Sequence, residues 1–282
     1  MTTRRIDAHQ HFWRLDRRDY GWLTPELTVL YRDFGPDDLA PILATTGIAA
    51  TILVQAAPTE AETRFMRFLA RETPFIAGIV GWIDMAAHDA PERIQVLKAD
   101  PKVRGIRPMI HDIPDPDWML GPGLAPAYRS VLEAGFTFDA LLRPVHLPRL
   151  RTLLERYPEL PTVIDHGAKP DIGHWQPGDA RFRAWAGHMT ALGSDSPAYC
   201  KISGLVTEAR PEWRPDELRP YLDHLLEAFG WDRLIWGSDW PVVDRAGGYA
   251  RWHGAASAWA AQFPPEDQAK LFGGNAARFY GV

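Results

Sequence analysis

The chain alternates between short, apolar, β-rich segments and amphipathic helical segments, with eight of each. Strands that alternate with helices favour a parallel sheet, and eight such units favour closure of that sheet into a barrel. We therefore predict an α/β fold, a (β/α)8 TIM barrel. The segments expected to form strands are 4–11, 48–57, 75–85, 103–110, 136–144, 162–168, 198–205 and 233–240. Those expected to form helices are 36–47, 60–73, 90–100, 124–135, 146–158, 179–193, 215–230 and 249–263.

The length of the chain fits one barrel. Barrels of this kind have about 250 residues, and the chain has 282. No linker or low-complexity segment separates the repeats, so we predict a single domain over residues 1–282. Residues 265–282 follow the last repeat and are expected to form a short helical extension packed on the outside. Glycines that follow four predicted helices are expected to act as C-terminal caps, namely Gly47, Gly135, Gly193 and Gly230.

Composition and charge exclude several classes of partner. The formal net charge is −5, and no basic patch indicates binding to nucleic acid. No apolar run is long enough to span a membrane. The N-terminal segment 1–13 lacks the apolar core of a signal peptide, so we expect a cytoplasmic protein. Cys200 is the single cysteine, which excludes an internal disulfide, and the oligomeric state is not indicated.

Four ionisable residues stand at the carboxyl ends of predicted strands, where barrel enzymes carry their active sites. His9 and His11 end the first strand, His166 ends the sixth, and Asp239 ends the eighth. A lone buried histidine is more often a hydrogen-bonded core residue, and an aspartate is often a helix cap or turn residue. Convergence from three strands favours catalysis instead, so we predict these four residues as the catalytic group.

The spacing within the strands adds detail to this prediction. Side chains in a strand alternate between the two faces, so His9 and His11 are expected on one face together with Asp7, and Gln10 on the other. Gly237 lies two residues before Asp239 and would leave room beneath that side chain.

Further polar and aromatic residues near strand ends are candidates for substrate contact. Arg107 could equally form a structural salt bridge. The roles of Lys169 and Lys201 stay open, since a lysine inside the barrel could neutralise Asp7 or another buried carboxylate. The predicted substrate-binding residues are Gln55, Trp82, Arg107, His111, Lys169 and Trp240.

Imidazoles and a carboxylate that converge in this way support two kinds of chemistry. His9, His11 and Asp239 could hold a single divalent ion such as zinc. Alternatively, Asp239 could act as general base on water while the imidazoles polarise a carbonyl without a metal.

Three motifs, DAHQHFW (7–13), VIDHGAKP (163–170) and WGSDWPV (236–242), resemble the amidohydrolase superfamily, and more narrowly its branch of sugar and dicarboxylate lactonases. The resemblance covers nearly the whole chain and implies a barrel that hydrolyses a lactone. It matches His9 and His11 to the family's first-strand histidines, His166 to its sixth-strand histidine and Asp239 to its eighth-strand aspartate. The fifth strand lacks the superfamily's histidine and the fourth its bridging lysine, which argues against two metals. We expect that no cofactor is required, with one divalent ion such as zinc as the alternative.

The resulting hypothesis is a hydrolase that opens a small sugar lactone, with water activated by Asp239 and the carbonyl polarised by histidines. A dicarboxylate substrate would need several convergent cations, and the strand ends offer Arg107 and Arg143 with little else. Dicarboxylate lactonase therefore stays an alternative, as does a metal-dependent decarboxylase. A sugar-binding barrel without activity is the third possibility.

Overall fold

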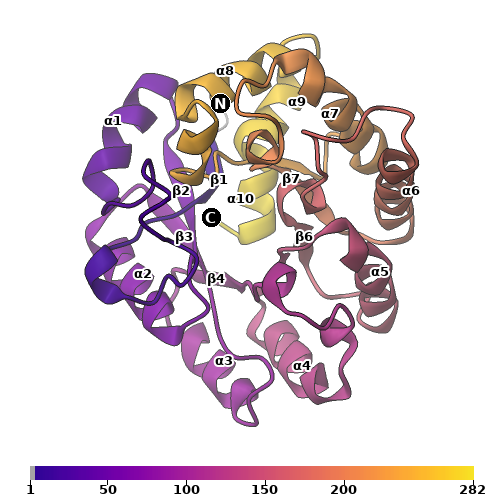
Figure 1. Ribbon diagram of the computed structural model, residues 1–282. Helices are drawn as coiled ribbons and strands as arrows, with labels where there is room; N and C mark the ends of the chain where they lie inside the picture. The colour runs from indigo at the N-terminus through magenta and orange to yellow at the C-terminus, as the bar shows by residue number, and fades with distance from the viewer. Residues whose placement is uncertain (1–3) are drawn as a thin grey trace.

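The structure, a computed structural model, describes residues 4–282, so the first three residues of the segment considered as a signal peptide lie outside the described residues. One parallel sheet carries the strands in sequence order. A bridge between Gln10 and Trp240 joins the last strand region to the first, so the sheet closes into the predicted TIM barrel (Figure 1). The strands are β1 Ile6–Gln10, β2 Ala50–Val54, β3 Ile76–Gly81, β4 Val103–Ile106, β5 Thr137–Ala140, β6 Thr162–Ile164, β7 Tyr199–Ile202 and β8 Leu234–Trp236.

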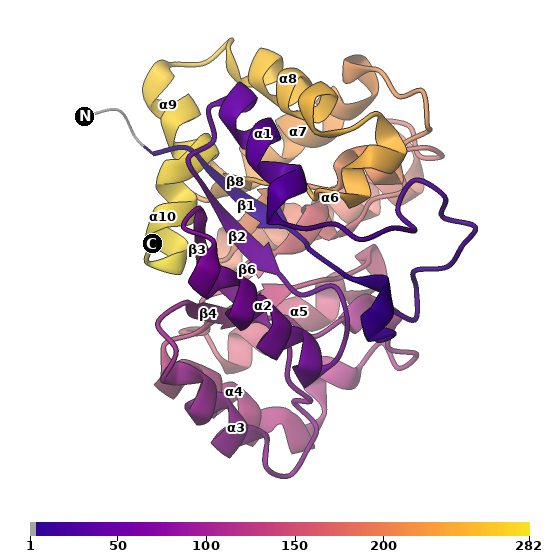
Figure 2. The same cartoon turned by 90° about the vertical axis from the view of Figure 1, so that its left-hand side faces the viewer.

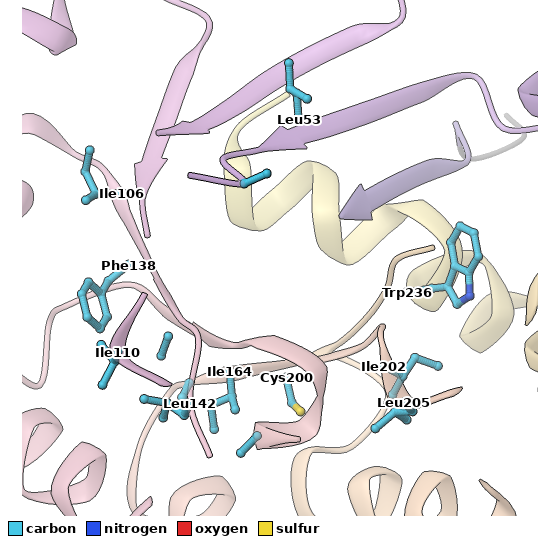
Figure 3. Packing of buried hydrophobic residues seen from close by; sticks show 14 of the residues in the cluster. Leu53, Ile106, Ile110, Phe138, Leu142, Ile164, Cys200, Ile202, Leu205 and Trp236 are labelled. Carbon is cyan, nitrogen blue, oxygen red and sulfur yellow. The ribbon is translucent and has the colours of Figure 1, made fainter. Parts of the chain in front are cut away.

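The helices surround the barrel (Figures 1 and 2). Side chains such as Leu53, Ile106 and Phe138 point outward from the strands and form the apolar layer on which the helices pack (Figure 3). None of the helices in residues 4–282 is long and apolar enough to cross a membrane. The eight helices that follow the strands are α1 Pro36–Thr46, α2 Glu60–Glu72, α3 Ala90–Lys98, α4 Ala125–Ala134, α5 Leu147–Arg156, α6 Ala180–Asp195, α7 Pro215–Phe229 and α8 Tyr249–Ala260.

The C-terminal extension is helical as predicted, but its predicted position was wrong. It forms α9 (Pro265–Ala269) and α10 (Asn275–Tyr280), and α10 lies at the centre of the ring of strands in Figure 1. Ala276 and Tyr280 pack against inward-facing residues of the strands, including those at the start of β1. The apolar side of α10 is thus buried in the amino-terminal end of the barrel and not on its outer surface.

The face assigned to Asp7 was also wrong. The register of β1 against β2 shifts between Asp7 and Gln10, which interrupts the alternation of side chains. Ala8 joins the apolar cluster around α10, whereas Asp7 accepts hydrogen bonds from the backbone amides of His9 (3.2 Å) and Ser238 (2.8 Å). The irregularity therefore leaves His9 and His11 facing the site without Asp7.

Two of the four predicted glycine caps have the left-handed conformation that such caps adopt. Gly47 (φ 70°) ends α1 and Gly135 (φ 72°) ends α4. Gly230 ends α7 with a different backbone geometry. The prediction for Gly193 was wrong, because α6 continues to Asp195 and Gly193 lies inside it.

Gly193→Ala is expected to destabilise the protein by about 1–3 kcal/mol, as overpacking does. A Cβ at this position would clash with the carbonyl oxygen of Ala228 in α7, so the two helices would have to separate. Gly187→Ala is the matched control in the same helix, since a Cβ there meets no atom within 4 Å and should stabilise by about 0.5–1 kcal/mol. Urea denaturation measures both changes, and equal effects of the two substitutions would contradict the packing argument.

Candidate active site

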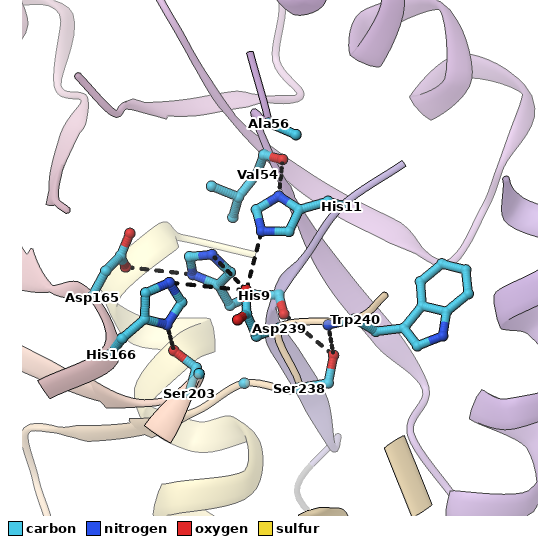
Figure 4. Close-up of polar contacts among 12 residues, drawn as sticks. His9, His11, Val54, Ala56, Asp165, His166, Ser203, Ser238, Asp239 and Trp240 are labelled. Atoms are coloured by element: carbon cyan, nitrogen blue, oxygen red, sulfur yellow. Dashed lines mark hydrogen bonds and ion pairs between the residues drawn. The ribbon is translucent and has the colours of Figure 1, made fainter. Parts of the chain in front are cut away.

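The four predicted catalytic residues lie together at the carboxyl ends of their strands. Three imidazoles surround Oδ1 of Asp239 (Figure 4), with the Nε2 atoms of His11, His9 and His166 at 3.2, 3.8 and 3.9 Å. All four side chains are at least 95% buried. The sequence prediction of this group is therefore matched by its geometry, while the catalytic role of each member stays a proposal.

His11 is held by hydrogen-bond acceptors on both sides of its ring. Its Nδ1 lies 2.7 Å from the carbonyl oxygen of Val54, and its Nε2 lies 3.2 Å from Asp239 (Figure 4). A carbonyl and a carboxylate can only accept, so both contacts are hydrogen bonds when both ring nitrogens carry hydrogen. These two contacts fix the His11 ring between β2 and Asp239.

His9 stands between a guanidinium and a carboxylate. Nη1 of Arg107 lies 3.2 Å from its Nε2, and Oδ1 of Asp165 lies 3.4 Å from its Nδ1. Arg107 and Lys201 can only donate, and Nζ of Lys201 lies 3.2 Å from Nδ1, so the two cations compete for the single acceptor nitrogen of a neutral ring. Burial, together with nearby Lys201, holds the pKa of His9 well below its usual value, so this imidazole is neutral near neutral pH.

His166 belongs to an unusual left-handed turn. His166, Gly167, Ala168 and Lys169 all have φ between 54° and 62°, and Asp239 has φ of 61°. Each non-glycine residue in this conformation costs roughly 1–2 kcal/mol. The turn directs His166 to Asp239, and its Nδ1 lies 2.9 Å from the hydroxyl of Ser203. Backbone strain is thus concentrated at residues of the site.

The aspartate of the site is charged near neutral pH, whereas two of its histidines are neutral. Burial alone would raise the pKa of Asp239, but His166 and His11 outweigh it and leave the pKa below its usual value. Burial lowers the pKa of His166 well below its usual value despite the nearby carboxylate of Asp239. Near neutral pH the site therefore combines an ionised carboxylate with neutral imidazoles at His9 and His166.

A cavity of about 230 Å³ adjoins this group. Its size is below the roughly 300–1,000 Å³ of drug-sized ligand pockets, which suits a small substrate. The residues that line it are His11, Trp22, Ala56, Arg107, Met109, His111, Asp112, Leu141, His166, Lys169, Asp239, Val242 and Arg245.

Three of the six predicted substrate-binding residues, Arg107, His111 and Lys169, line this cavity. The other three do not. Gln55 is fully buried and donates to the carbonyl oxygen of Arg107 (2.8 Å).

Both tryptophans of the prediction lie elsewhere as well. Trp82 faces two neighbouring cavities, one of which shares Trp22 and Met109 with the site. Trp240 is 1% exposed, packs on Phe12 and Phe34, and points away from the histidines (Figure 4).

Two buried carboxylates of the site were not predicted. Asp165 contacts His9 and Arg107, and Asp139 contacts Lys201, whose Nζ lies 2.6 Å from Asp139 and 3.0 Å from Asp165. Lys201 thus neutralises carboxylates other than Asp7. The sequence feature that could have revealed Asp139 is an acidic residue inside an apolar strand, since Phe138 and Ala140 flank it.

The donor atoms fit one divalent ion in number and type. The group whose ligand atoms lie within 4.8 Å of one another is His9, His166 and Asp239, which differs from the predicted set by His166 in place of His11. Two imidazoles and a carboxylate are ordinary zinc ligands. However, Nη1 of Arg107 lies 3.2 Å from Nε2 of His9, and its positive charge opposes the binding of a cation at that nitrogen.

Comparison with known proteins agrees with the barrel fold. The amidohydrolase family matches residues 6–282. The L-fucono-1,5-lactonase of Burkholderia ambifaria is 46% identical over 99% of this chain and 96% of its own length. The enzyme of the same name from Burkholderia multivorans is 34% identical over 100% and 97%. A crystal structure of a Burkholderia multivorans amidohydrolase with bound zinc superposes with a TM-score of 0.92, at 34% identity and 99% coverage of both chains.

The fold and the site thus define a barrel hydrolase with a histidine and aspartate centre. The chain belongs to the amidohydrolase family. The predictions of the amidohydrolase superfamily and of a lactone hydrolase are confirmed.

Proposed function

We propose that this chain hydrolyses the ring ester of a small sugar lactone, L-fucono-1,5-lactone or a close stereochemical relative. The observation that carries the proposal is the ionised Asp239 surrounded by three imidazoles beside a cavity of about 230 Å³. The two lactonases at 46% and 34% identity support the same substrate class.

In ring opening, Asp239 transfers the proton, and hydrogen donors on the cavity wall stabilise the negative charge. Asp239 takes a proton from water, and the water oxygen attacks the ring carbonyl. Hydrogen donors at the cavity wall, the Nε2–H of His11 and the Arg107 guanidinium, stabilise the negative oxygen that forms. Protonated Asp239 then returns the proton to the ring oxygen as the ester bond breaks, which gives the open hydroxy acid.

Charge at the cavity favours a neutral lactone over a dicarboxylate. Arg107 is paired with Asp165, and Lys169 with Glu208 (2.5 Å), so neither cation is free for a second carboxylate. His111 pairs with Asp112 (3.0 Å). Arg245 is one further cation on the wall, whereas a dicarboxylate would need several convergent cations. The paired groups can still exchange hydrogen bonds with hydroxyls, as a polyhydroxylated ring requires.

We further propose that hydrolysis does not require a metal. A divalent ion held by His9, His166 and Asp239 would supply a Lewis acid for the carbonyl. Without one, the Arg107 guanidinium, 3.2 Å from Nε2 of His9, already offers positive charge at the same place.

The test is a panel of sugar lactones assayed by proton release, with and without a chelator. Turnover of a fuconolactone-type substrate that persists after chelation supports both parts of the proposal. Loss of turnover on chelation, restored by zinc, contradicts the metal-free part alone. Release of CO₂ from aromatic acids without lactone opening would contradict the function itself.

The pH dependence of kcat/KM follows from the directions of the pKa shifts. Activity needs Asp239 ionised and the imidazoles of His9 and His166 neutral. All three pKa values are lowered, the histidines well below 6.5 and Asp239 below 3.8. Lowering the pH therefore inactivates the enzyme only below pH 6.5. Stopped-flow proton release, corrected for spontaneous hydrolysis, measures this loss of kcat/KM at acidic pH. A midpoint above pH 6.5 would contradict the protonation states assigned to Asp239, His9 and His166.

A further inference from the structure

A second cavity, of about 360 Å³, adjoins the cavity of the catalytic group and is larger than it. Trp22, Met109 and Asp112 line both cavities, so a molecule bound at the catalytic group can extend past these residues into the neighbouring space. The catalytic cavity alone is smaller than the roughly 300–1,000 Å³ of typical ligand pockets, whereas the second cavity falls within that range. We call it the side cavity, and the residues of its wall that matter here are Trp22, Trp82, Asp84, Met109, Asp112 and Trp118.

Three tryptophans, Trp22, Trp82 and Trp118, give the side cavity an aromatic wall. They belong to the loops that follow β1, β3 and β4, and each is half-buried. The indole of Trp22 is fixed, because its Nε1 donates to the carbonyl oxygen of Ala56 (2.7 Å) and its ring packs perpendicular to that of Trp13 with centroids 5.3 Å apart. Rigid aromatic faces of this kind bind a ligand with little loss of conformational freedom.

Asp84 and Asp112 are the only charged side chains among the described residues that line the side cavity. Asp84 accepts a hydrogen bond from the backbone amide of Ala86 (3.0 Å), and Asp112 pairs with His111 (3.0 Å). An ionised carboxylate has about four lone-pair positions, so each aspartate can accept further hydrogen bonds from a ligand. An anionic group would meet two negative charges in this wall and no cation.

Aromatic faces beside carboxylate oxygens match a neutral sugar ring. A sugar such as galactose has a face of C–H groups that packs on an aromatic ring, and it has hydroxyls at its edge that donate to carboxylates. A purely apolar group would displace water from the two aspartates without replacing its hydrogen bonds. The wall of the side cavity therefore favours a neutral sugar over both an anion and a hydrocarbon.

We propose that the side cavity is a subsite for a neutral sugar linked to the lactone, so that the enzyme also opens the lactones of disaccharide acids. This inference rests on the proposed function, because it places the lactone ring beside Asp239. One water is added across the ring ester and gives the open hydroxy acid. The glycosidic bond to the second sugar stays intact.

L-Fucono-1,5-lactone, compared with its three derivatives that carry a galactosyl group on O2, O3 or O4, tests the proposal. For at least one derivative, kcat/KM is expected to be about tenfold higher than for the parent lactone, mainly through a lower KM. An increase of this size corresponds to one well-packed aromatic contact. A kcat/KM no higher than that of the parent for all three derivatives overturns the proposal.

Trp118→Ala locates the effect, with Trp175→Ala as the matched control. Trp118 lines the side cavity but not the catalytic cavity, and the half-buried Trp175 lines neither. Trp118→Ala is expected to remove the tenfold preference for the galactosyl derivative and to leave kcat/KM for the parent lactone within about twofold. Trp175→Ala should keep the preference. Asp84→Ala changes an exposed side chain of the same wall and should also lower the preference. A preference that is unchanged in both Trp118→Ala and Asp84→Ala overturns the proposal.

Isothermal titration with galactosyl-L-fucitols tests the subsite without any reaction, since these reduced sugars contain no ester. The wild type is expected to bind at least one of them about tenfold more tightly than L-fucitol, and Trp118→Ala to bind both kinds equally. Such binding by a protein that opens no lactone contradicts the proposed function and leaves the subsite. Lactone turnover without any preference for a galactosyl group overturns the subsite and leaves the proposed function.

Discussion

Replacing Asp239 by Asn is expected to lower kcat for lactone hydrolysis by about 10²–10⁴, the usual contribution of a general base. The amide has nearly the shape of the carboxylate but cannot take a proton from water. Asp239 has φ of 61°, a conformation that asparagine also tolerates, so the variant should keep its fold. KM should change little, because the substrate still meets the same wall of the cavity.

Steady-state kinetics on the best lactone, beside thermal unfolding, measures this effect. Asp244→Asn is the matched control, since Asp244 lies five residues further along the same segment and does not line the cavity. It should retain nearly the wild-type kcat. Near-normal turnover by folded Asp239→Asn would falsify the assignment of the base.

The fold could be predicted because its signal is local and repeated. Each strand and helix carries its own periodicity, and helix bounds such as those of α2 (predicted 60–73, observed Glu60–Glu72) differ by a few residues at most. The position of α10 could not be predicted, because the apolar surface that it covers forms only when strands from the whole chain close into a barrel. Gly193 was mistaken for a cap because its packing against Ala228 involves a different helix.

The catalytic group could be predicted because parallel strands bring their carboxyl ends together. Its supporting partners could not. Asp139 and Lys201 are separated by 62 positions, and their contact depends on strand register and on which face each side chain takes. The left-handed turn at His166 also left no clear mark in the sequence, since three of its four residues are not glycine.

Arg107→Met is expected to raise the affinity of the site for zinc at least about 30-fold. Nη1 of Arg107 lies 3.2 Å from Nε2 of His9, the nitrogen of this candidate zinc ligand that faces Asp239 at 3.8 Å. Two unit charges about 4 Å apart repel by ~1 kcal/mol even in water, and a divalent ion doubles this to about 2 kcal/mol. That difference corresponds to about 30-fold in binding, and the repulsion is larger where water is excluded.

Isothermal titration of the apo protein with zinc, together with metal analysis, measures this affinity without reference to activity. Arg107→Lys keeps the positive charge and should retain weak binding. Arg245→Met removes a cation from the same cavity wall but leaves the Arg107 contact with His9, so it should raise the affinity far less. Equal zinc affinities of Arg107→Met and the wild type would show that the guanidinium does not compete with the metal. Tighter binding in Arg107→Met alone would show that the Arg107 guanidinium weakens zinc binding to this group of ligands and so favours hydrolysis without a metal.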